Sequence, residues 1–163
     1  EHGKVFTQKE KRDAERLADA FLRNEQALRL LDNSEFEVPA CGMIGGYPFR
    51  GKADVLGKNK IVDLKTTNSL NSFSRLVNGR QLGDCAKYGY DIQVYIYCEL
   101  FNVPYTEFVF GVIDKGTLDI GIYYVGEDFY NEGKRKTHEA IEVFETFFIH
   151  GADLDNYTYT GTL

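Results

Sequence analysis

The 163-residue sequence lacks any apolar run near the length of about 20 residues that a membrane-spanning helix needs. Its polar beginning, EHGKVFTQKEKRD, does not have the form of a signal peptide. Both absences argue against a membrane partner. An initiator Met is missing too, so the chain is compatible with a fragment of a longer protein.

Cysteine is scarce, and its spacing is uninformative for metal binding. Cys41, Cys85 and Cys98 form no C-x-x-C pair. An odd number of cysteines without metal-ligand spacing indicates free thiols in a reducing compartment, which disfavours a disulfide scaffold or a zinc site. We expect all three to be small buried apolar residues.

Excess positive charge is absent, since the net charge is −6. This disfavours a protein that binds nucleic acid over its whole surface, although it leaves room for a local basic groove. The same acidic balance fits a set of carboxylates gathered around a cation. Repeats and Pro/Gly-rich linkers are also lacking, so we interpret residues 1–163 as one domain.

What the sequence does contain is a regular succession of helix and strand patterns. A T-x-x-E capping box at Thr7 and Glu10 starts the first helix. Gly45-Gly46 and residues 57–59 mark hairpin turns of an antiparallel meander. Residues 68–87 are expected to form a loop with one short helix. Helices are expected at about residues 8–31, 88–101 and 132–150, and strands at 36–43, 47–56, 60–65, 107–113 and 119–125.

Apolar periodicity predicts which helix faces are buried. In the middle helix the expected core stripe is Ile92, Tyr95, Ile96 and Leu100. In the last helix the residues expected to face inward are Ala140, Ile141, Phe144, Phe147 and Phe148. The element order predicts an α+β fold with a mixed sheet and helices packed against it.

The segment IVDLKTT, residues 61–67, places a carboxylate and an ammonium on one face of a strand. Asp63 and Lys65 are two residues apart, so their side chains project to the same side. A hairpin turn at 57–59 brings Asp54 near Asp63. Two carboxylates this close repel unless a cation offsets them. Mg²⁺ prefers such oxygen ligands, and the backbone carbonyl of Leu64 is a natural further ligand.

Lys65 can orient a water or neutralise charge on a phosphate during attack. A metal-bound water, a nearby cation and several carboxylates are what phosphodiester hydrolysis requires. The alternative is a surface ion pair between Asp63 and Lys65, worth under about 1 kcal/mol. The position of Asp54 behind this pair favours a site.

Three motifs in order resemble the PD-(D/E)xK nuclease superfamily, and most of all its RecB-like and RecE-like exonuclease branch of phages and bacteria. They are G-K-A-D ending at Asp54, D-L-K-T-T starting at Asp63, and Q-x-x-x-Y formed by Gln93 and Tyr97. Gln93 and Tyr97 are i and i+4 on one helix stripe. The resemblance covers most of the chain.

This resemblance implies a restriction-endonuclease-like αβββαβ core and DNA cleavage that depends on Mg²⁺ or Mn²⁺. Asp54 and Asp63 would bind the metal, Lys65 would be catalytic, and Gln93 and Tyr97 would support the site or contact DNA. An exonuclease is favoured over an endonuclease, acting on linear duplex DNA with free ends in recombination or DNA processing. The implied setting is the cytoplasm of a bacterial or phage-infected cell. A homo-oligomer and a single-strand annealing protein are the implied partners.

The first acidic position of the family is open between two residues. Glu37 matches better, because it directly precedes the apolar strand residues, and it is our candidate for a further catalytic and metal-binding group; Glu35 is the alternative. Many relatives carry an upstream His, for which His2 is the candidate.

Basic residues lie around the motifs and predict a DNA-binding surface. Such side chains contact phosphates and supply affinity without reading sequence. Tyr88 is interleaved with them and suits base stacking. The alternative is a solvated loop. The predicted contacts are Arg50, Lys52, Arg75, Arg80, Lys87 and Tyr88.

Two other functions compete with a nuclease. A non-catalytic DNA-binding or assembly module could retain the fold, but the intact Asp54, Asp63 and Lys65 argue against it. A glycoside hydrolase would also use paired carboxylates. It would leave Lys65 unexplained, and the chain has no Trp for sugar stacking.

Overall fold

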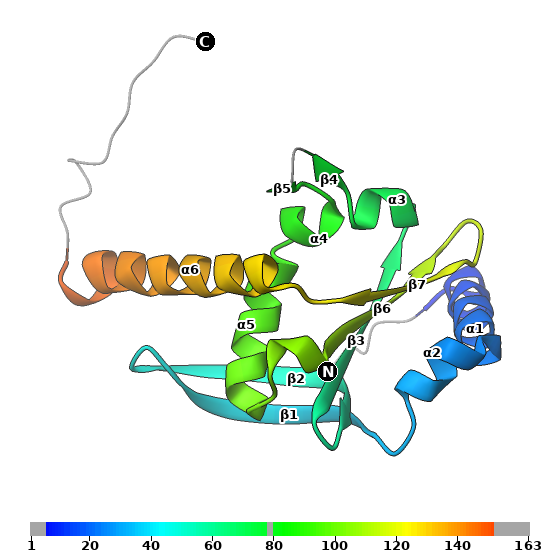
Figure 1. Cartoon of the computed structure of the whole chain (residues 1–163), viewed down its shortest axis with the longest axis horizontal. Helices are drawn as coiled ribbons and strands as arrows, with labels where there is room; N and C mark the ends of the chain where they lie inside the picture. Colours follow the sequence, from blue (N-terminus) through cyan, green and yellow to red (C-terminus); the bar gives the residue numbers. More distant parts are fainter. Residues whose placement is uncertain (1–5, 78–79, 152–163) are drawn as a thin grey trace, which may run out of the picture.

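The computed structural model describes residues 6–77 and 80–151 and has a five-stranded mixed sheet at its centre (Figure 1). The strand order is β1-β2-β3-β6-β7, and only β3 and β6 run parallel to each other within this sheet. The predicted α+β class, with a mixed sheet flanked by helices, is confirmed. The strands are β1 (Glu35–Ile44), β2 (Tyr47–Gly57), β3 (Lys60–Thr67), β6 (Phe108–Asp114) and β7 (Ile120–Tyr124).

Strands β1 to β3 form the predicted antiparallel meander. Gly45 and Gly46 connect β1 to β2 with φ values of +57° and +85°, a backbone conformation that glycine adopts without a steric penalty.

Within residues 6–77 and 80–151 no helix is both long and apolar enough to cross a membrane.

One face of the sheet is covered by α1 (Gln8–Arg23) and α2 (Glu25–Leu30). The capping box of Thr7 and Glu10 is present. The single helix expected over residues 8–31 is wrong, because Asn24 takes an extended conformation and its side chain accepts a hydrogen bond from the N–H of Ala27. Asn24 therefore caps α2. A small core cluster on this face joins Leu30 and Leu31 to Val55, Val62 and Val109.

The opposite face carries the larger core and is covered by α5 (Tyr90–Phe101). The expected core stripe is partly wrong: Val94, Tyr95 and Cys98 are buried, whereas Ile92 and Ile96 are half-buried. The reason is that α5 packs against the sheet and also against α6 (Glu127–Phe144), so the buried side of α5 is wider than the predicted stripe and centred on other residues. The larger cluster contains Ala53, Ile61, Phe73, Cys85, Val94, Cys98, Val103, Phe108, Phe110, Val112 and Val125.

The segment between β3 and α5 has more structure than the expected loop with one short helix. It contains α3 (Leu70–Phe73), β4 (Leu76–Val77), β5 (Arg80–Gln81) and α4 (Asp84–Lys87). Phe73 and Cys85 insert into the larger core, so the segment is docked on the sheet despite its polar sequence.

The last helix contradicts the predicted burial. Ala140, Phe144 and Phe148 are exposed, while Ile141 and Phe147 are half-buried. The C-terminal half of α6 and the π-helical turn η2 (Glu145–Ile149) extend past α5 and lie beside the end of the β1–β2 hairpin, which leaves these side chains largely uncovered (Figure 1). Phe144 instead makes an edge contact with Tyr47 at the end of the β1–β2 hairpin. A 3₁₀ turn, η1 (Tyr105–Glu107), precedes β6.

Burial is predicted for all three cysteines and is found for two of them. Cys85 and Cys98 are buried free thiols, but Cys41 is exposed. Cys41 lies opposite Arg50 in the β1–β2 ladder, on the face of the hairpin that α5 does not cover.

Candidate active site

Asp54 marks a change in the geometry of β2. Ala53 belongs to the core cluster under α5, whereas Val55 belongs to the cluster beside α2, so the alternation of side chains is broken at Asp54. The β2–β3 ladder begins at the pair Val55–Val62, which places Asp54 just beyond the last paired residue. Asp54 Oδ2 accepts a hydrogen bond from the N–H of Leu64 at 2.9 Å. The Asp54 carboxylate therefore accepts a hydrogen bond from β3 at a position where the backbone of β2 is no longer paired with it.

Asp63 is a charged group held inside the protein. It is 1% exposed, and its Oδ1 accepts a hydrogen bond from the amide of Gln93 on α5. The ammonium of Lys65 forms an ion pair with Oδ2, yet Oδ2 has no hydrogen bond of acceptable geometry. Burial raises the pKa of Asp63, and the charge of Lys65 only partly opposes that shift.

Lys65 is fixed by two neighbours of different chemistry. Its side chain is 19% exposed and pairs with Asp63. Its Nζ also lies 4.8 Å from the centre of the Tyr90 ring, within the range of a cation–π contact. Burial raises the pKa of Tyr90, so this phenol stays neutral beside the ammonium. Lys65 is therefore oriented as well as charged.

Gln93 and Tyr97 point toward the same strands but contact different groups. Gln93 touches Asp63 directly. The Tyr97 hydroxyl accepts a long hydrogen bond of 3.4 Å from the N–H of Lys52. A Cβ on Gly51 would lie 2.7 Å from the Tyr97 ring, so this ring packs on the backbone of β2. Gln93 can orient a site carboxylate, whereas Tyr97 supports the strand that carries Asp54.

Glu37 lies in β1 and takes the unusual φ of +55°. Its carboxylate pairs with Lys52, and its side chain is exposed. No group of three acidic, His or Cys side chains able to hold a metal is found in the described ranges 6–77 and 80–151. Glu37 is therefore not grouped with Asp54 and Asp63 among these residues, and its carboxylate pairs with Lys52 of β2. Glu35 is exposed at the start of β1, and His2 lies outside the described residues.

Comparison with models of known protein families shows which family the chain belongs to. A family model described as "PDDEXK-like domain of unknown function (DUF3799)" matches residues 2–150. The chain belongs to this family of PDDEXK-like domains. Its D-L-K motif at Asp63 and Lys65, with Asp54 on the preceding strand, is the PD-(D/E)xK pattern for which the superfamily is named.

Solved structures show that the PDDEXK-like domain has a known fold. A crystal structure described as "Putative exonuclease" from Eubacterium rectale has a TM-score of 0.74 at 20% identity and covers 98% of this chain. The match spans 66% of that chain, so the PDDEXK-like domain corresponds to about two thirds of its length. The crystal structure of SSO0001 has a TM-score of 0.41 at 19% identity, covering 81% of this chain and 69% of that one. No curated protein matches the sequence.

The residues of the PDDEXK-like domain fit a hard divalent cation. Asp54 and Asp63 present carboxylates from neighbouring strands, and the buried Oδ2 of Asp63 is paired with the ammonium of Lys65. A buried anionic oxygen that needs a cationic partner is the type of ligand that a hard metal ion takes. Mg²⁺ and Mn²⁺ accept a small number of carboxylates together with waters.

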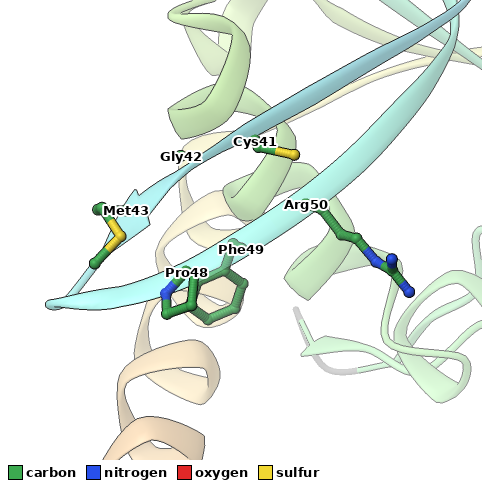
Figure 2. Close-up of a pocket in the computed structure, with 6 residues that line it drawn as sticks. All are labelled: Cys41, Gly42, Met43, Pro48, Phe49 and Arg50. Atoms are coloured by element: carbon green, nitrogen blue, oxygen red, sulfur yellow. The ribbon is translucent and has the colours of Figure 1, made fainter.

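The predicted DNA contacts of the PDDEXK-like domain fall into two groups. Arg50 and Lys52 lie on β2, and Figure 2 shows the Arg50 side chain reaching away from Met43, Pro48 and Phe49 at the other end of a shallow pocket. Arg75, Lys87 and Tyr88 are exposed on the segment between β3 and α5. The side chain of Arg80 lies outside the described part of the structure.

Two contacts of the PDDEXK-like domain escaped the reasoning from sequence. One is the cation–π contact of Tyr90 with Lys65. Its signal was present, because Tyr90 precedes Gln93 by three residues and therefore shares its helix stripe. The other is the ion pair of Lys136 with Asp91, a residue that is 1% exposed at the crossing of α5 and α6. No local pattern marks that pair, since 45 residues separate its members.

Proposed function

We propose that this PDDEXK-like domain is a metal-dependent nuclease that hydrolyses phosphodiester bonds in DNA. The observation that carries the proposal is the convergence of Asp54, Asp63 and Lys65 at one point of the sheet. A carboxylate that is 1% exposed and paired with a largely buried ammonium adds little net stability, because desolvation offsets the ion pair. It is well explained by a cation site next to a phosphate.

Each residue has a role that follows from its contacts. Asp54, Asp63 and the carbonyl of Leu64 would hold Mg²⁺ or Mn²⁺. When bound, the ion supplies Lewis acidity and an acidified water. Lys65 presents its ammonium to a non-bridging phosphate oxygen or to the attacking water. Gln93 fixes the rotamer of Asp63 through Oδ1, while Oδ2 pairs with Lys65.

We further propose an exonuclease rather than an endonuclease, acting on linear duplex DNA in recombination or DNA processing. The support is the resemblance of the motifs and the description of the neighbouring structure as an exonuclease. A single-strand annealing protein as partner and a homo-oligomeric state belong to the same proposal and rest on the resemblance alone. Arg50, Arg75, Arg80 and Lys87 would hold phosphates along the bound strand.

The deciding experiment compares linear and closed circular duplex DNA with Mg²⁺, with Mn²⁺ and with EDTA. We expect metal-dependent loss of the linear form only, and we expect Lys65→Ala to abolish it. The matched control is Lys58→Ala, which removes an exposed lysine in the β2–β3 turn. Cleavage that persists in Lys65→Ala contradicts the assigned site. Tight DNA binding without cleavage under either metal would instead support the non-catalytic module.

A further inference from the structure

Two tyrosine rings lead from Lys65 to the surface of the domain. The Nζ of Lys65 lies 4.8 Å from the centre of the Tyr90 ring, and the Tyr90 and Tyr88 ring centres are 6.1 Å apart. Tyr90 is half-buried against Phe73 and Phe110, whereas Tyr88 is 62% exposed. The exposed Tyr88 ring is therefore linked through the Tyr90 ring to the Lys65 ammonium, which we assign to the scissile phosphate.

Tyr88 is exposed although the residues around it are packed. Cys85, three residues earlier, is 4% exposed and belongs to the larger core. A tyrosine that served only to close α4 would bury its ring there. Lys87 places its Nζ 5.4 Å from the centre of the Tyr88 ring and forms no ion pair with any residue of the described ranges. An open aromatic ring with an unpaired ammonium is the combination that single-stranded nucleic acid binds, by base stacking and phosphate contact.

The backbone beneath Tyr88 is firmly held. The N–H of Tyr88 donates to the carbonyl of Asp84 at 2.9 Å. Gly83 packs so tightly that an added Cβ would lie 2.4 Å from the carbonyl oxygen of Phe73. Gly89 follows with φ of +70°, which sets the direction of α5. The ring is consequently presented in a fixed position, and little ordering is needed when a base stacks on it.

We propose that Tyr88 is a stacking surface for an unpaired base of the substrate strand, with Lys87 moving from the ring to a phosphate. The substrate class is thus DNA with a single-stranded or frayed nucleotide beside the cleavage site. Inside an intact duplex both faces of a base are covered by its neighbours, so away from a blunt end only an unpaired or extruded base can use the ring. This inference rests on the proposed function for the place of the strand, but the stacking itself can be measured without cleavage.

The test uses an oligonucleotide with 2-aminopurine in a short single-stranded overhang, bound to the full chain in EDTA. Stacking on Tyr88 should quench the fluorescence. Tyr88→Ala should abolish the quenching and weaken binding of the overhang substrate about tenfold or more. Tyr88→Phe should keep both, and a closed circular duplex should bind Tyr88→Ala and the wild type alike. The control is Tyr124→Ala, which removes another exposed tyrosine on β7, with melting temperatures recorded for every variant.

The outcomes separate this inference from the nuclease assignment. Equal quenching and affinity in Tyr88→Ala and Tyr124→Ala overturn the stacking surface, whether or not the wild type cleaves DNA. Quenching that depends on Tyr88 while no metal supports cleavage upholds the stacking surface and overturns the nuclease. Wild-type protein that neither quenches nor cleaves overturns both.

Discussion

The carboxylate of Asp54 accepts a hydrogen bond from the N–H of Leu64, the residue that follows Asp63. This bond forms where β2 changes the face of its side chains and separates from β3. A side chain thereby replaces a backbone acceptor in the sheet. The result is that Asp54 lies beside the segment of β3 that carries Asp63, just beyond the end of the β2–β3 ladder.

Asp63→Asn should raise the melting temperature by a few °C at pH 7 while abolishing metal-dependent cleavage. Burial raises the pKa of Asp63 in the folded state. At any pH above the pKa of this carboxyl in the unfolded chain, the raised value therefore lowers the free energy of unfolding. A shift of a few °C is what about 1 kcal/mol produces at this chain length. Thermal unfolding measures it, with Asp19→Asn on the exposed side of α1 as the control. A drop of several degrees would mean that the ion pair with Lys65 outweighs desolvation.

Gln93→Ala and Tyr97→Ala should have different effects, because Gln93 positions the Asp63 carboxylate and Tyr97 stabilises the strand that carries Asp54. Removing the amide that fixes Asp63 should lower Mn²⁺ affinity and cleavage about 10- to 100-fold and destabilise the domain by only about 1 kcal/mol, the cost of leaving Oδ1 without its donor. Removing the Tyr97 ring should destabilise the domain by about 3 kcal/mol, because the ring packs on Gly51 and on Phe101. Mn²⁺ titration and urea unfolding distinguish the two. Equal loss of stability in both variants would contradict the separate roles.

Glu132 should make the domain acid-sensitive. Hydrogen bonds from Arg135 lower the pKa of Glu132 to about 2 from its usual 4.5. A carboxylate whose folded pKa is depressed stabilises the fold above the unfolded value and loses that effect as pH falls through the folded one. The urea midpoint of the wild type should exceed that of Glu132→Gln at pH 7, and the gap should close between pH 4.5 and about 2. Glu142→Gln, on the same helix, should show no gap, and a gap independent of pH would contradict the ionic cause.

One cysteine should react with a thiol reagent in the folded protein. Cys41 is exposed on the hairpin, whereas burial raises the pKa of Cys98 to about 12 and also raises that of Cys85. Dithiobisnitrobenzoate should therefore titrate one thiol per chain in buffer and three in guanidinium. Cys41→Ser should remove the fast reaction. Rapid labelling of Cys41→Ser in buffer would show that α5 opens readily.

Local signals succeeded where neighbours in sequence decide the structure. Thr7 and Glu10 cap a helix because both lie within one turn, and Gly45-Gly46 closes a hairpin through its own φ values. The same kind of reasoning failed at Asn24, whose extended backbone ends one helix and whose side chain starts the next. It failed again at Phe144 and Phe148, where the apolar periodicity is real but the end of the β1–β2 hairpin covers too little of these rings.

The candidate site shows the same division. The motifs named Asp54, Asp63, Lys65 and Gln93; the structure joins the side chain of Asp63 to those of Lys65 and Gln93, and Asp54 bonds the backbone N–H of Leu64 beside them. The interpretation of the motifs placed Glu37 with them, but Lys52 across the β1–β2 pair takes its carboxylate. Competition between two nearby charges for one partner depends on side-chain geometry, which spacing in a sequence does not encode.

The sequence alone determined the five strands of the central sheet in their order, the meander and the polar residues of β3, because these follow from periodicity, turn chemistry and the alternation of a strand. The tertiary structure decided how those residues interact. Parallel pairing of β3 with β6 and the packing of α5 remove Asp63 from water, and this raises its pKa and brings Gln93 to its carboxylate. Desolvation is a property of everything that packs around a group, so it arises only once segments distant in the chain have come together.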